Sequence, residues 1–281
     1  MDPPLMEAPN DFGNPLARWM HHHCKSSVVY VEFRPNQARV LQEWNNVDPI
    51  AQGPGAAERL AARDEQSGAA MRCTGFFLSV PTAPPHRIHV LTVAHALHPV
   101  FNAGFPITAA QAEWMYQPWI LCEHLEQAFL DGDEQLRRFT RGHIVNISCQ
   151  NDLLVIQLTQ AHMAGYCEQV HWPLSVAQRF PPCTDSVMML SWPEVGRSAA
   201  TARGEISHPD RMIQYLGGRN PFGFTTRLSE VGIRSEQGSS GAPLLDGWGE
   251  VVGVLHGGNT VVSFFVGLTE IRNTLMGWGL I

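Results

Sequence analysis

Short apolar runs separated by turn-forming residues recur along most of the chain. These runs are rich in β-branched and aromatic residues, which favour strands. Strands of this length and spacing are typical of a β-barrel, and no internal repeat is evident. We expect strands at 27–33, 74–80, 88–93, 143–147, 153–158, 186–191, 203–207, 243–245, 250–256 and 261–267, followed by a short helix from Glu270 to about Trp278.

Three segments depart from this pattern. Residues 1–24 contain Pro-rich clusters and the run His21-His22-His23 without a clean period, and we expect a solvated tail there. Adjacent histidines point in different directions, which makes the run a poor metal site. Residues 34–71 are rich in Ala, Gln and Gly and predict a loop with a short helix, whereas 108–138 has apolar residues at helical spacing.

Composition excludes several classes of protein. The 281 residues are enough for one large or two small domains, and 44% hydrophobic against 16% charged residues argues against disorder. The net charge of −7 gives no attraction to nucleic acid or anionic lipid. No apolar run approaches the ~20 residues of a membrane span. We therefore expect neither a nucleic-acid nor a membrane partner.

Six cysteines are present, and none forms a C-x-x-C pair, which excludes zinc-ribbon and thioredoxin motifs. The first residues contain no basic stretch followed by an apolar one, so no secretory signal is expected. The simplest interpretation is a soluble cytoplasmic protein with reduced thiols, without a metal or a cofactor. The cysteines are Cys24, Cys73, Cys122, Cys149, Cys167 and Cys183.

Three short segments contain residues that can do chemistry. His95 ends an apolar strand, Asp152 immediately precedes one, and Ser240 lies at the tip of a glycine-flanked turn. Each alone is ordinary: a core histidine, an acid that caps a strand, a serine in a β-turn. Together, their order His…Asp…Ser matches one serine-hydrolase fold and differs from the Asp…His…Ser and Ser…Asp…His orders of two others. Too few residues follow Ser240 for an α/β-hydrolase, and Ala242 replaces a glycine of its motif.

On these motifs the chain resembles chymotrypsin-fold (trypsin-like) serine proteases, closest to the HtrA-type and glutamyl-endopeptidase-like branch. The resemblance covers 25–281, and it implies an all-β, double β-barrel chymotrypsin-like fold with a barrel boundary near 160–180. The segments 34–71 and 108–138 would be insertions, the second one helical, and a short helix would end the chain. The matching segments are Ser26–Val29, Gly75–Leu78, Leu91–His95, Asn151–Val155, Ala202–Ser207, Gly238–Leu244 and Val251–Val254.

The resemblance also implies a role for each residue of the motifs. Ser240 would be the nucleophile, His95 the general base, and Asp152 the group that holds the histidine. The backbone N–H groups of Gly238 and Ser240 would form the oxyanion hole, which requires of Gly238 a conformation that a side chain resists. Ser239 is a rival nucleophile, but only Ser240 follows Gly238 by two residues as the motif requires.

Departures from the family pattern concern regulation. Ser239 stands where secreted relatives have an Asp that pairs with a newly cut N-terminus, which argues against that mode of activation. Ala96 and Glu236 occupy positions of disulfide cysteines in secreted relatives, which supports a reducing compartment. We expect no PDZ module of the kind typical of HtrA-type proteases. The insertions are candidates for partner docking or gating, or they only cover the barrel.

Specificity depends on residues near Ser240. Arg234 falls at the position that forms the pocket floor in trypsin-like enzymes, where a guanidinium would favour an acidic P1 side chain. Alternatively Arg234 is a solvated loop residue, and P1 is small or aliphatic. His256 lies one residue from the position of a substrate-reading histidine and would bind substrate; alternatively, that slip turns it to the other face, where it would contact the triad instead. Ser235, Gly257 and Gly258 would line the pocket.

The leading hypothesis is thus a regulated intracellular serine endopeptidase that cleaves protein substrates and is controlled by a partner protein, by oligomerisation or by a gating loop. The second hypothesis is a latent or catalytically silent protease fold that acts as a binding or scaffold module. Metal-dependent hydrolysis ranks behind both, because the sequence contains no H-E-x-x-H motif.

Overall fold

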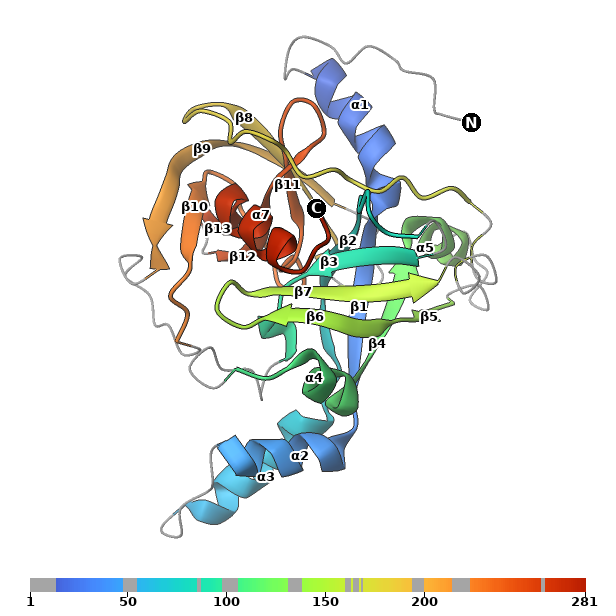
Figure 1. Ribbon diagram of the computed structural model, residues 1–281, viewed down its shortest axis with the longest axis vertical. Helices are drawn as coiled ribbons and strands as arrows, with labels where there is room; N and C mark the ends of the chain where they lie inside the picture. The colour runs from blue at the N-terminus through green and yellow to red at the C-terminus, as the bar shows by residue number, and fades with distance from the viewer. Residues whose placement is uncertain are drawn as a thin grey trace.

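The computed structural model of the chain describes residues 14–47, 55–84, 87–97, 106–130, 138–159, 163, 167, 169–193, 200–213, 223–258 and 261–281. The strands form two β-sheets, with helices at the periphery (Figure 1). The strands are β1 (Val28–Pro35), β2 (Met71–Leu78), β3 (Arg87–Thr92), β4 (Tyr116–Cys122), β5 (Thr140–Arg141), β6 (His143–Ser148), β7 (Leu153–Thr159), β8 (Ser186–Ser191), β9 (Ala200–Met212), β10 (Arg227–Val231), β11 (Pro243–Leu245), β12 (Val251–Gly258) and β13 (Ser263–Gly267). The helices are α1 (Asn14–Cys24), α2 (Gln37–Val47), α3 (Ala56–Gly68), α4 (Ala109–Met115), α5 (Glu123–Leu130) and α7 (Leu268–Gly277), with 3₁₀ turns η1 (Lys25–Ser27) and η2 (His95–Leu97).

The first sheet has seven antiparallel strands in the order β5-β4-β1-β2-β3-β7-β6 and is curled into a half-barrel. The second sheet is a closed barrel in the order β10-β13-β12-β11-β8-β9. Apolar runs with β-branched residues, such as Val28–Val31 and Leu153–Ile156, lie in these strands, since the pleated surface suits them. The expected all-β, double-barrel fold with a C-terminal helix is confirmed.

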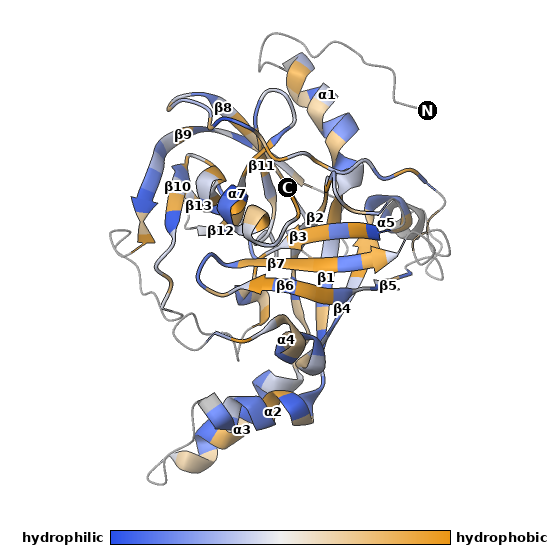
Figure 2. Cartoon of the chain, in the orientation of Figure 1, coloured by the Kyte–Doolittle hydropathy of each residue, from blue (hydrophilic) through white to orange (hydrophobic). Residues whose placement is uncertain are grey.

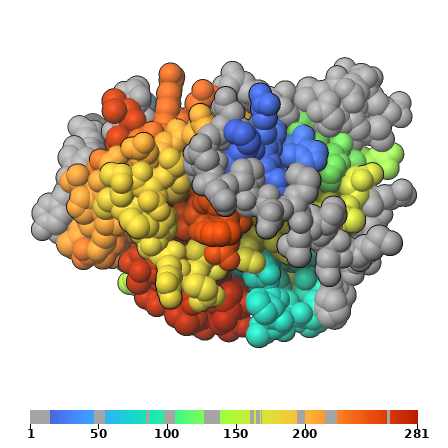
Figure 3. Space-filling model, turned by 90° about the horizontal axis from the view of Figure 1, so that it is seen from above, coloured from blue at the N-terminus to red at the C-terminus, as the bar shows by residue number. Residues whose placement is uncertain are grey.

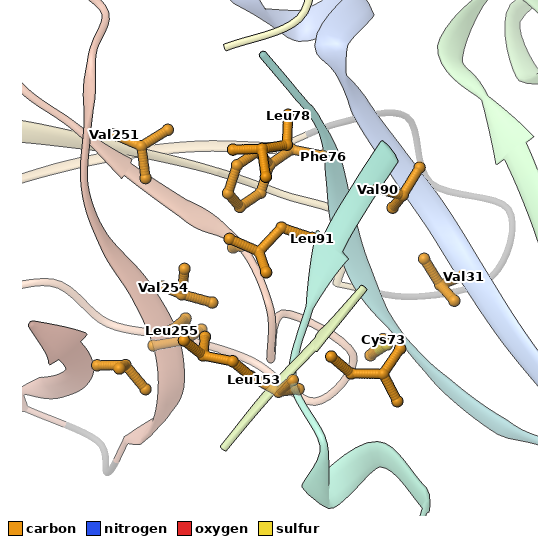
Figure 4. Packing of buried hydrophobic residues seen from close by; sticks show 14 of the residues in the cluster. Val31, Cys73, Phe76, Leu78, Val90, Leu91, Leu153, Val251, Val254 and Leu255 are labelled. Atoms are coloured by element: carbon orange, nitrogen blue, oxygen red, sulfur yellow. The ribbon is translucent and has the colours of Figure 1, made fainter. Parts of the chain in front are cut away.

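The two barrels share one hydrophobic core. Figure 4 shows Phe76 and Leu91 of the first barrel beside Val254 and Leu255 of β12, and these four side chains are almost fully buried. Close packing of apolar groups across this boundary means that the barrels cannot move apart without exposing it to water. The segments that end on either side of the boundary are therefore held in a fixed relation.

The N-terminal segment differs from expectation. Residues 14–24 form helix α1 rather than a solvated tail, and Leu16, Met20 and Cys24 are buried in the core. Figure 3 shows α1 (blue) on the upper face beside the yellow and orange segments of the second barrel. Leu16, Met20 and Cys24 follow a four-residue spacing that puts all three on one helix face. Residues 1–13, with their Pro-rich clusters, lie outside the described residues.

The segment 34–71 also differs, because it contains two helices instead of one short one. Helices α2 and α3 extend away from the barrels (Figure 1), and their surface is largely hydrophilic (Figure 2). Their base is anchored, since Val40 is buried in the core. The Arg63 guanidinium lies 4.9 Å from the Trp44 ring and holds α3 against α2.

Within 108–138 the prediction of a helical insertion is wrong in the middle. The segment contains α4, then strand β4, then α5, and β4 pairs with the central strand β1. Trp119 and Leu121 therefore belong to the first barrel. The apolar run is too short for its pattern to distinguish a helix from a strand, and pairing with β1 decided between them. Residues 131–137 lie outside the described part.

The remaining expectations concern the C-terminus, the thiols and membranes. Helix α7 occupies Leu268–Gly277, close to the predicted range. All six cysteines are free, and only Cys183 is exposed. Among the described residues, no helix is both long and apolar enough to cross a membrane.

Candidate active site

His95 and Asp152 meet at the ends of two paired strands. His95 begins η2 just after β3, and Asp152 lies in the tight turn before β7, with a left-handed φ of +54°. Because β3 pairs with β7, the two residues are brought to the same edge of the sheet. The His95 backbone N–H donates to Asp152 Oδ1 (2.7 Å), and His95 Nδ1–H donates to Oδ2 (2.6 Å). This pairing fixes both the position of the ring and its tautomer.

A second imidazole contacts the same carboxylate. His256 lies in β12 at a register shift between Leu255 and Gly257, and its Nδ1–H donates to Asp152 Oδ2 (2.5 Å). The structure thus has the contact with the proposed triad that was the alternative for this residue. Phe224 packs edge-on against His256, with ring centroids 4.7 Å apart. Sequence patterns do not reveal Phe224, because its segment has no motif.

The Asp152 carboxylate is completely buried. Burial alone works to raise its pKa, but the charges and hydrogen bonds of His95 and His256 outweigh burial and hold the pKa of Asp152 well below its ordinary value. The three side chains are grouped closely enough to be considered for a metal ion. However, N–O separations of 2.5–2.6 Å are hydrogen-bond distances, shorter than two ligands of one zinc ion allow, so protons bridge these atoms.

Ser240 lies in a turn whose conformation requires glycine on both sides. Gly238 has φ +88° and Gly241 has φ +87°. A Cβ on Gly238 would lie 2.3 Å from the Pro193 carbonyl oxygen, and one on Gly241 would lie 2.1 Å from that of Thr74. The conformation expected for Gly238 is therefore present.

Thr74 of β2 attaches this turn to the first barrel. Its N–H donates to the Ser240 carbonyl oxygen (2.8 Å), and its hydroxyl donates to the Gly238 carbonyl oxygen (2.9 Å). The same hydroxyl accepts from the Trp192 N–H (2.9 Å), and the Thr74 carbonyl accepts from the Thr92 hydroxyl (2.6 Å). Thr92 precedes His95 by three residues, so one network joins the Ser240 turn to the strand that carries His95. Sequence reasoning missed Thr74, since a threonine opening a strand is common.

The two neighbouring serines have different surroundings. Ser239 is 1% exposed, and its hydroxyl donates to Ser191 Oγ (3.3 Å). Ser240 is only partly buried. Of the two, only Ser240 has access to the surface, because Ser239 is enclosed in the second barrel.

The residues predicted to bind substrate lie on two facing segments. Ser235 approaches β12 closely, since a Cβ on Gly258 would lie 2.4 Å from Ser235 Oγ. Gly257 is partly buried and has open space where a side chain would be. Arg234 is exposed and forms no ion pair within the described part of the chain.

No family model and no curated protein matches this chain. Several solved structures do match it. The active form of the Rv3671c protease from M. tuberculosis is 18% identical, with a TM-score of 0.57 over 95% of this chain and 86% of that one. An inactive form of the same protease is 17% identical (TM-score 0.54, 93% of each chain). Deg5 is 16% identical (TM-score 0.56, 96% of this chain and 98% of that one). The chain thus has the fold of these structures, which is the trypsin-like double barrel.

Proposed function

We propose that this protein is a serine endopeptidase that cleaves proteins through an acyl-enzyme. The observation that carries the proposal is the buried Asp152, which accepts two hydrogen bonds from His95, whose strand is joined to the partly exposed Ser240 turn through Thr92 and Thr74. The structurally similar proteins, two forms of one protease among them, support the same class.

In this mechanism Ser240 Oγ attacks the scissile carbonyl while His95 Nε2 takes the hydroxyl proton. Asp152 keeps the proton of neutral His95 on Nδ1 and stabilises the imidazolium that forms. His95 then passes the proton to the leaving amine, and water hydrolyses the ester by the same steps. The N–H groups of Gly238 and Ser240 stabilise the oxyanion, and losing one such donor costs about 3–4 kcal/mol of activation free energy.

His256 adds a second donor to the acid of this triad. His256 donates to Asp152 Oδ2, the same oxygen that accepts from His95 Nδ1–H. The carboxylate is thereby held by both barrels, one through η2 and the other through β12. His256 acts through Asp152 as a positioning residue, and its Nδ1 is not available to read substrate.

The Ser240→Ala variant tests the proposal directly. We expect wild type to react covalently with a fluorophosphonate probe and Ser240→Ala not to react, while cleavage of a protein substrate falls at least about 10⁴-fold. Ser239→Ala is the matched control and should still be labelled, because its hydroxyl is buried against Ser191. Mass spectrometry of the labelled peptide locates the modified serine.

Absence of labelling in folded wild type, also after addition of candidate activators or protein substrates, would contradict the proposal. It would favour the alternative of a latent or silent protease fold that binds proteins. Labelling of Ser239 instead of Ser240 would reject the assignment of the nucleophile but not the class of enzyme.

We further propose an acidic P1 preference carried by Arg234. Support comes from its exposed guanidinium, which lacks an ion-pair partner in the described residues, next to the segment where Ser235 faces Gly258. Arg234→Ala should lower the preference of kcat/KM for Glu over Ala at P1 by about 10–100-fold. Arg227→Ala, an exposed arginine paired with Asp210, should leave the profile unchanged. A profile dominated by Lys or Arg, or one that Arg234→Ala does not alter, would count against acidic P1.

Cytoplasmic location and regulation by a partner protein complete the proposal. Six free cysteines, with Ala96 and Glu236 at disulfide positions of secreted relatives, support a reducing compartment. The hydrophilic α2–α3 pair, which extends away from both barrels, is the segment best placed to receive a regulator (Figure 2).

A further inference from the structure

Two cysteines and two histidines converge at one side of the first barrel, away from the His95–Asp152 pair. Cys122 is the last residue of β4, and His124 is the second residue of α5. Cys167 and His171 come from the connection between the two barrels. One ligand atom of each side chain lies within 4.8 Å of the others, and both cysteines are buried. Elements distant in sequence thus bring together four of the best transition-metal ligands.

The separations fit a single tetrahedral ion. Zinc binds sulfur at about 2.3 Å and imidazole nitrogen at about 2.0–2.1 Å, so tetrahedral ligand atoms lie roughly 3.3–3.8 Å apart. The distance from Cys167 Sγ to His124 Nδ1 is 3.7 Å. A two-iron cluster distributes its ligands over two metals and would spread them further than the 4.8 Å seen here.

His171 is oriented as a ligand by a second group. Its Nδ1–H donates to the Ser26 carbonyl oxygen (3.0 Å), which leaves the lone pair on Nε2. That Nε2 is buried and has no hydrogen-bond partner among the described residues. Histidines that bind metals usually donate their other N–H to a carbonyl or carboxylate in this way. A buried nitrogen without such a bond is costly unless another ligand takes its lone pair.

The surroundings hold the four side chains in place. The His171 ring lies between those of Phe77 and His124, with centroids 4.9 Å from each. The Ser27 hydroxyl donates to the Trp172 carbonyl and ties the barrel connection to η1. Lys25 of the same turn lies 3.9 Å from Glu123, next to His124. The cluster is therefore preorganised by contacts that do not depend on a metal.

We propose that Cys122, His124, Cys167 and His171 bind one zinc ion with a structural role. Four protein ligands leave no open position for water or substrate, which distinguishes this site from a catalytic one. The ion fastens the connection between the barrels onto β4 and α5. A disulfide between the two cysteines is the competing outcome, but it would make no use of the two imidazoles. This proposal departs from the expectation of a chain without a metal.

Metal analysis of the full-length protein tests the site. Protein purified without chelator in the presence of Zn²⁺ should contain about one zinc per chain by elemental mass spectrometry. Cys167→Ser and His124→Ala should each lose at least about 90% of it. Cys149→Ser, a buried free cysteine elsewhere, and His21, His22 and His23 replaced together by Ala should retain it. Cobalt substitution should give the visible bands of a tetrahedral site with thiolate charge transfer.

Chelation provides a readout that does not need the variants to fold. Removing the metal from wild type should lower the melting temperature, and Zn²⁺ should restore it. The proposal is overturned if zinc-supplied wild type contains no zinc, or if peptide mapping finds a Cys122–Cys167 disulfide in its place. Zinc that disappears with the His21–His23 replacement, or that remains in both Cys167→Ser and His124→Ala, overturns it as well. None of these measurements depends on protease activity.

Discussion

At the scale of single residues, the candidate active site depends on Thr74 as much as on its titratable groups. All four polar positions of Thr74 are engaged: its N–H, its carbonyl and both roles of its hydroxyl. Two of these bonds hold the carbonyls of Gly238 and Ser240, whose N–H groups are the proposed oxyanion hole. A hydroxyl that both donates and accepts in a buried position is difficult to replace.

The Thr74→Val variant tests this role. Valine keeps the shape but leaves the Gly238 carbonyl and the Trp192 N–H unsatisfied, at a cost of roughly 1–3 kcal/mol. We expect kcat for peptide hydrolysis and the rate of fluorophosphonate labelling to fall about 10–100-fold, with little change in KM. Thr74→Ser retains the hydroxyl and should restore most of the activity. Equal rates for Thr74→Val and wild type would show that the turn is held by other contacts.

At the scale of elements, helix α1 shows how a segment without a clear period joins the core. Only every fourth residue of α1, Leu16, Met20 and Cys24, is buried, and histidines dominate its last turn. So narrow an apolar stripe is hard to recognise in eleven residues. Contact with β8 and with η1 gives the helix its place.

Met20→Ala should therefore destabilise the whole protein. Met20 is 0% exposed, and truncating a buried methionine costs about 2–5 kcal/mol. The free energy of unfolding, measured with urea, should fall by that amount. Arg18→Ala on the exposed face of α1 is the control and should change it by no more than about 0.5 kcal/mol. If Met20→Ala were equally neutral, α1 would not be docked in solution.

At the scale of the whole molecule, two barrels enclose one continuous core (Figure 4). The candidate site lies where they meet. The Asp152 carboxylate connects the two barrels, because it accepts hydrogen bonds from His95 of the first and from His256 of the second. Thr74 of the first barrel likewise forms hydrogen bonds to Gly238 and Ser240 of the second. Separating the barrels would thus dismantle the site.

Leu91→Ala probes this dependence. Leu91 is fully buried beside Val254 of β12, so its truncation should cost about 2–5 kcal/mol. Hydrogen exchange should accelerate in β8 and β11 of the second barrel as well as in β2 and β7. Leu60→Ala, on the exposed side of α3, should leave exchange in both barrels unchanged. Faster exchange confined to the first barrel would mean that the two barrels unfold independently.

The sequence by itself determined most strands, the C-terminal helix and the order of His95, Asp152 and Ser240, because these depend on local periodicity and short motifs. The resemblance to trypsin-like proteases also implied an unusual conformation for Gly238, and its φ of +88° agrees with that. Tertiary structure alone decided that Trp119 lies in a strand, since pairing with β1 outweighs an ambiguous pattern. It alone decided between the two orientations open to His256 and brought His171 to Cys122, because contacts across many residues depend on strand register and on the path of the barrel connection, which no local pattern encodes.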